Sequence, residues 1–141
     1  EQFINASNQV NQLFSNNSPS KESWIGKGIG MSGVNINLAM SNNYCRSEII
    51  FNRGSQEENK ELYDFIYQMK DKIENDFGGQ LTWERMDDKV TCRVKAQLDG
   101  VSYFEESDWK KMNEFLIDVS VRMERAFKEP IRKLNNYWKN K

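Results

Sequence analysis

The sequence predicts an α+β domain in which helices cover one face of an antiparallel sheet. Two segments, residues 34–51 and 81–98, alternate apolar and polar residues with the period of a half-buried strand. Each is followed by a stretch whose apolar residues recur at helical spacing. Two hairpins and two helices in series, after an N-terminal helix, favour one sheet with its helices on one face. The predicted order is α-β(β)β-α-β-β-α, in which the bracketed strand is a short fifth one.

Residues 1–14 are predicted to form an amphipathic helix, because their apolar residues lie at helical spacing. A polar loop follows over residues 15–23. Glycines at 26, 28, 30 and 33 indicate an irregular or bulged first strand that begins near Trp24.

Residues 34–77 are predicted to form the first hairpin and its helix. Val34 and the alternate residues after it point inward, and the turn at 41–43 leads into a return strand. In that strand the series from Cys45 to Phe51 points inward. The apolar stripe from Leu62 to Phe77 predicts one helix, which Gly78 and Gly79 end.

The second unit repeats this order. Trp83 marks a short strand, and a longer strand is predicted from Val90 to Leu98. Ser107 is the expected N-cap of the last helix, and Pro130 is expected to end or kink it. An internal ββα duplication is one explanation for the repeated order. The other is that any two hairpin-plus-helix units share such a pattern.

Length and composition favour a single domain over residues 1–141. Twenty Lys and Arg oppose twenty-one Asp and Glu, so the net charge of -1 predicts no global attraction to nucleic acid or membrane. No stretch approaches the roughly 18 apolar residues that span a bilayer. Cys45 and Cys92 form no CxxC pair and fit buried thiols of a cytoplasmic protein. Because the chain begins at Glu1 without Met, we expect a C-terminal fragment of a larger protein.

The sequence offers no recognisable catalytic, cofactor or metal site. It contains no histidine, which removes the usual general base and the commonest metal ligand. Glu58-Asn59-Lys60 and Asp87-Asp88-Lys89 match the acidic-x-Lys half of a restriction-type nuclease site. We interpret them as helix-start and turn residues. The glycine-rich segment 26–33 lacks the Gly-Lys-Ser/Thr ending of a phosphate-binding loop.

Two surfaces are candidates for partner contacts. The outer face of the sheet, opposite the helices, is predicted from the strand alternation and carries both signs of charge. Its candidate residues are Tyr44, Arg46, Glu48, Glu84, Arg93 and Lys95. The C-terminal tail, residues 122–141, holds seven basic against two acidic residues. Its candidate phosphate contacts are Arg132, Lys133, Lys139 and Lys141.

An ordered set of motifs runs along nearly the whole chain. In these motifs the sequence resembles a bacterial family designated domain of unknown function 4268. The motifs are Ser18-Pro19-Ser20, Arg46-Ser47-Glu48, Asn52-Arg53-Gly54, Glu57-Glu58-Asn59-Lys60, Ile73-Glu74 and Trp83-Glu84-Arg85-Met86-Asp87-Asp88. Such domains often follow a region similar to restriction endonucleases. The resemblance therefore implies a DNA-defence or DNA-processing context, and it supplies no catalytic residue.

Three functional classes remain open. The favoured one is a non-catalytic interaction domain that binds an upstream region of the same parent chain. The second is a DNA-contacting accessory domain of a nuclease-like protein, which the basic tail supports. The third is a peptide-binding or homodimer-forming module, because the element order is similar to the type III secretion chaperone fold. Fold similarity alone does not establish function.

Overall fold

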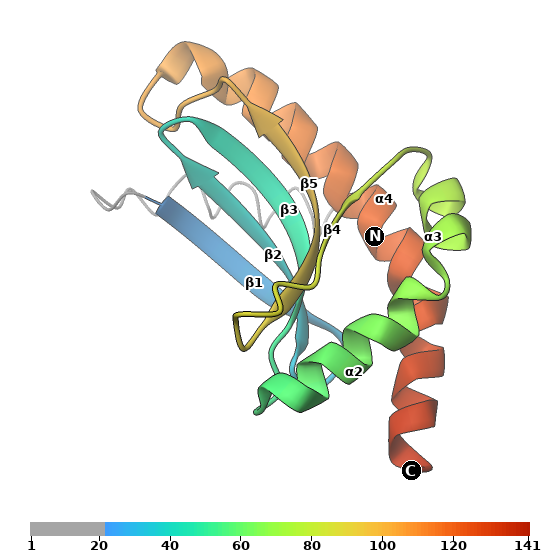
Figure 1. Cartoon of the computed structure of the whole chain (residues 1–141). Helices are drawn as coiled ribbons and strands as arrows, with labels where there is room; N and C mark the ends of the chain where they lie inside the picture. Colours follow the sequence, from blue (N-terminus) through green and yellow to red (C-terminus); the bar gives the residue numbers. More distant parts are fainter. Residues whose placement is uncertain (1–21) are drawn as a thin grey trace.

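The structure, a computed structural model, describes residues 22–141. They form an antiparallel sheet with the strand order β1-β2-β3-β5-β4, and helices lie against one face of it (Figure 1). The strands are β1 (Glu22–Met31), β2 (Val34–Ser41), β3 (Tyr44–Phe51), β4 (Thr82–Glu84) and β5 (Cys92–Asp99). The helices are α2 (Gln56–Tyr67), α3 (Lys70–Phe77), the 3-10 turn η1 (Glu106–Asp108) and α4 (Trp109–Lys139). The predicted α+β class is confirmed, and the predicted N-terminal helix 1–14 lies outside the described residues.

The strand register confirms the predicted alternation of the first hairpin. Val34 is the Cα partner of Phe51, and Met40 is the partner of Cys45. The inward residues of β2 and β3 are buried, while β1 contains a bulge between Gly28 and Met31, in the predicted glycine-rich segment. Because one face of these strands is buried, slipping the register by one residue would expose every core side chain.

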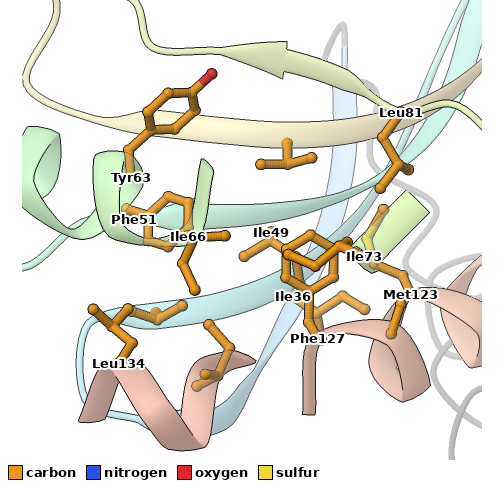
Figure 2. Close-up of a cluster of buried hydrophobic side chains, with 14 of the residues drawn as sticks. Ile36, Ile49, Phe51, Tyr63, Ile66, Ile73, Leu81, Met123, Phe127 and Leu134 are labelled. Atoms are coloured by element: carbon orange, nitrogen blue, oxygen red, sulfur yellow. The ribbon is translucent and has the colours of Figure 1, made fainter. Parts of the chain in front are cut away.

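The hydrophobic core lies between the sheet and α4. Figure 2 shows Phe127 and Met123 of α4 among side chains of the sheet and of α2 and α3. A second buried cluster, which includes Leu38 and Leu116, lies nearer the N-terminal end of α4. The helix runs along the sheet, and its C-terminal turns continue past the strands beside α2 (Figure 1). None of the helices in residues 22–141 is long and apolar enough to cross a membrane.

The structure corrects the predicted single helix between the hairpins. It divides at Gln68 and Met69, where the Met69 backbone leaves the helical region at φ -102° and ψ 17°. Both α2 and α3 pack against α4, and α2 also packs against β3 and β5. Ile66 of α2 and Ile73 of α3 are buried in the same core cluster, so the chain changes direction between the two helices without exposing either side chain.

The predicted start of the last strand is also wrong. β5 begins at Cys92, and the Val90 side chain is 51% exposed rather than inward-facing. The reason is a contact from α2, in which Asn59 Nδ2 donates a hydrogen bond to the Val90 carbonyl at 2.8 Å. That bond holds Val90 in the turn before the strand.

The predicted start of the last helix needs correction, and of the two predictions for Pro130, that it ends the helix or kinks it, the first is wrong. Ser107 lies in η1, and α4 begins at Trp109 after Asp108, whose carboxylate accepts a hydrogen bond from the Ser102 N–H at 3.0 Å. Pro130 does not end α4, which continues to Lys139. Proline removes a helical hydrogen bond. Buried side chains on both sides of it keep the helix against the core, and they are Ala126, Phe127, Ile131 and Leu134.

Candidate functional site

The structure brings all six predicted outer-face residues onto one face of the sheet. Glu48 of β3 is the Cα partner of Lys95 of β5, and Glu84 of β4 is the partner of Arg93. Their side chains form a continuous set, which we call the outer-face ion pairs. These are Arg46–Glu48 at 3.1 Å, Arg93–Glu48 at 3.4 Å, Arg93–Glu84 at 2.5 Å and Lys95–Glu84 at 3.5 Å.

The outer-face ion pairs are more buried than the solvated surface that alternation alone suggests. Glu48 is 4% exposed, and the Arg46 side chain, whose guanidinium lies over the Tyr44 ring, is 12% exposed. Burial opposes ionisation of Glu84, but hydrogen bonds and charges from Arg93 and Lys95 outweigh it and lower the pKa of Glu84. These groups therefore stabilise the sheet, and their role as a partner surface stays a prediction.

A cleft of about 600 Å³ lies between α2 and the turn that joins β4 to β5. It contains parts of both acidic-x-Lys patterns found in the sequence. Its lining residues are Gln56, Glu57, Lys60, Glu61, Asp64, Arg85 and Asp87. The distances within this cleft decide whether the two patterns can carry chemistry.

Lys60 is buried and holds the β4–β5 turn through its ammonium group. Its Nζ donates to the carbonyl oxygens of Arg85 at 2.6 Å, Met86 at 2.8 Å and Thr91 at 2.9 Å. It also lies 3.3 Å from Cys92 Sγ. Met86 has φ of 52°, a left-handed conformation that is uncommon outside glycine. The Lys60 contacts therefore hold the β4–β5 turn, in which Met86 adopts an unfavourable backbone conformation.

Sequence reasoning missed the burial of Asn59 and Lys60. Asn59 accepts a hydrogen bond from the Arg53 N–H at 2.7 Å, in addition to its bond to the Val90 carbonyl. The missed signal is helical spacing, because Asn59 precedes Leu62 by three positions and Ile66 by seven. A polar residue on the buried stripe of a helix requires an internal hydrogen-bond partner.

Two carboxylates of the cleft, Asp64 and Asp87, form internal contacts with Arg85. Arg85 binds Asp64 through two parallel bonds, at 2.9 and 3.0 Å, and its Nη1 bonds to Asp87. The Glu58 N–H donates to Ser55 Oγ at 3.1 Å in the first turn of α2, as a helix-start residue does. Within residues 22–141, no group of three or more His, Cys, Asp or Glu side chains is arranged to hold a metal ion.

The two thiols are buried and protonated. Burial, with a smaller contribution from the charge of Asp99, raises the pKa of Cys45 to about 12. Burial also raises the pKa of Cys92, although Lys60 opposes that shift. Because the thiolate is the reactive form, neither cysteine is poised as a nucleophile.

Comparison with known protein families matches residues 1–131 to the family described as Domain of unknown function (DUF4268). The chain belongs to this family. Searches of curated proteins and of solved structures found no match. The family resemblance of the sequence is therefore confirmed, and the description of DUF4268 assigns it no activity.

Half of the predicted phosphate contacts in this DUF4268 domain are paired internally. Arg132 bonds to Glu129 at 2.8 Å, and Lys141 bonds to Glu61 at 2.7 Å. Lys133 and Lys139 are exposed. The tail is thus less available to phosphate than its charge suggests, and its contact with nucleic acid stays a prediction.

Trp138 anchors the tail to the fold rather than standing free for base stacking. Its ring is half-buried and packs against the larger core cluster. The Lys141 ammonium lies 4.2 Å and the Arg53 guanidinium 5.4 Å from the ring centre. A cation within about 6 Å of the centre of such a ring is attracted to it, so both side chains help to hold Trp138 in place.

Proposed function

We propose that this DUF4268 domain is a non-catalytic interaction domain. The observation that carries the proposal is that the Lys60 ammonium group donates hydrogen bonds to three backbone carbonyls. A nuclease lysine must instead stabilise the scissile phosphate, beside carboxylates that hold a metal. Asp64 and Asp87 are bound to Arg85. The cleft that looks most like an active site by its residue types is therefore explained by the stability of the fold.

The sheet supports the interaction half of the proposal. β1 is an edge strand of ten residues that pairs with β2, and no other described strand pairs with it. The unpaired backbone groups of an edge strand are a ready site for another chain.

We expect the chain to hydrolyse neither DNA nor RNA in the presence of Mg²⁺ or Mn²⁺. The assay uses fluorescent single-stranded and duplex substrates, with EDTA-treated samples as the blank. Glu58→Ala and Asp88→Ala variants distinguish an activity of this chain from a contaminating nuclease. Metal-dependent cleavage that either variant abolishes would overturn the proposal.

A DNA-contacting accessory function is the second candidate, favoured by the exposure of Lys133 and Lys139 on the last turns of α4. If the tail contacts phosphates, DNA affinity will fall steeply with salt, because each neutralised phosphate releases counterions. Replacing Arg132, Lys133, Lys139 and Lys141 with Ala will then flatten that dependence. Fluorescence anisotropy with labelled DNA measures it, and absence of binding at low salt removes this candidate.

A further inference from the structure

A hollow lies on the surface of α4, the helix that packs against the edge strand β1. The hollow has a volume of about 320 Å³, and its lining residues are Asn113, Glu114, Ile117, Asp118 and Val121. Asn113, Ile117 and Val121 lie four positions apart and so form one row on the helix. Ile117 and Ile25 of β1 pack against the same buried cluster, and Lys27 of β1 pairs with Glu124 of α4 at 2.9 Å. The row therefore follows the side of α4 that faces β1.

The hollow offers hydrogen-bond acceptors and negative charge. Asn113 Oδ1 is buried and has no hydrogen-bond partner among the described residues. Because that atom is covered, the acceptors that a ligand can reach in the hollow are carboxylates. Glu114 and Asp118 add carboxylates at the rim, although Asp118 already pairs with Arg122 at 2.8 Å. Ile117 and Val121 supply the apolar surface between these acceptors.

A lysine and a bulge commonly protect a sheet edge from pairing with another strand. In β1 neither of them blocks pairing between Glu22 and Gly28. An inward-pointing lysine discourages edge pairing, but Lys27 is already neutralised by Glu124. The bulge lies beyond Gly28, so the register from Glu22 to Gly28 is regular. A strand of about seven residues can therefore pair with this edge.

We propose that the edge of β1 and the hollow on α4, which together we call the groove, bind an extended segment of a protein partner. On the face that the segment turns toward α4, apolar residues take turns with Lys or Arg. The inference rests on the proposed interaction function and names its surface and ligand. A strand added to β1 would lie about 4.8 Å from it and point every second side chain toward α4. Its apolar residues would contact Ile117 and Val121. Its cationic residues would donate to Glu114 and Asp118.

The charge of the rim favours such a partner over a second copy of the chain. Two-fold pairing of β1 strands would place two α4 helices on the same side of one continuous sheet. The carboxylates of Glu114 and Asp118 would then approach the same carboxylates of the other copy, and like charges at an interface are unfavourable.

The test measures the affinity of fluorescently labelled ten-residue peptides for the full chain by anisotropy. One peptide, the Val/Lys peptide, carries Val and Lys by turns at every second position with Thr between them, so that one face of an added strand presents both. Its matched control has Glu in place of each Lys. A third carries N-methyl groups on alternate amides, which removes the hydrogen bonds of an added strand. We expect the Val/Lys peptide to bind and both controls to bind about tenfold or more weakly. Equal binding of the Glu peptide or of the N-methylated peptide would overturn the proposal, as would no binding at all.

Charge reversal locates the binding site. We expect Glu114→Lys to weaken binding of the Val/Lys peptide about tenfold, and Val121→Arg to weaken it at least as much. Glu106→Lys, on exposed η1, is the matched control and leaves the affinity unchanged. Thermal unfolding verifies that each variant folds.

Equal effects of Glu114→Lys and Glu106→Lys would contradict the location. A mass that doubles with concentration, without peptide binding, would assign the groove to a second copy instead. Either result leaves the non-catalytic proposal standing, because that proposal fails only in the nuclease assay.

Discussion

Replacing Lys60 with methionine is expected to lower the free energy of unfolding by about 3 kcal/mol. Methionine retains most of the apolar length of the side chain but removes the ammonium group. The carbonyl oxygens of Arg85, Met86 and Thr91 then lose a charged donor at 2.6 to 2.9 Å. Because Lys60 is only 8% exposed, water cannot easily replace that donor.

Urea unfolding followed by circular dichroism measures this loss. Lys72→Met is the control, because Lys72 is 58% exposed and its i,i+4 pair with Asp76 is expected to contribute at most about 0.5 kcal/mol. Equal stability of the two variants would mean that Lys60 does not hold the β4–β5 turn. The cleft would then have to be reconsidered as a site for chemistry.

Arg93→Ala is expected to cost about 2 kcal/mol of stability and to leave the association state unchanged. Arg93 bonds to both Glu48 and Glu84, and its loss leaves the buried Glu48 carboxylate with Arg46. The alternation of charges by itself suggests solvent-exposed ion pairs, and each such pair contributes only about 0 to 1 kcal/mol. The expected loss for Arg93→Ala is larger than that.

Thermal and urea unfolding of Arg93→Ala, beside analytical ultracentrifugation, separates the two roles of the outer face. Arg132→Ala is the matched control, because Arg132 is 58% exposed and pairs with Glu129 on the same helix. Unchanged stability together with weakened self-association or partner capture would assign the outer face to an interface. A loss of stability alone would assign it to the sheet.

The strand pattern was predictable because it depends on local alternation. A strand with one buried face exposes its hydrophobic residues if it slips by one position, so the inward series from Cys45 to Phe51 follows directly from the sequence. The same alternation placed Arg46 and Arg93 on the outer face. It could not show that β3 and β5 are neighbours, and that adjacency is what brings Glu48 to Lys95.

The predictions that were wrong depend on contacts between residues far apart in the sequence. Asn59 and Lys60 hold a turn 25 to 31 residues away, and this explains why Val90 lies outside β5. The break at Met69 likewise accompanies the packing of α2 and α3 against α4, which lies much later in the sequence. Local patterns show neither which element a buried polar group will reach nor where a helix must change direction.

Amide hydrogen exchange of the chain with the Val/Lys peptide tests the interaction proposal most directly. We expect slowed exchange at the β1 amides that point away from β2, because an added strand would occupy them. We also expect peptide-dependent NMR shifts along the row from Asn113 to Val121. Protection confined to other strands, or unchanged β1 exchange while the peptide is bound, would contradict it.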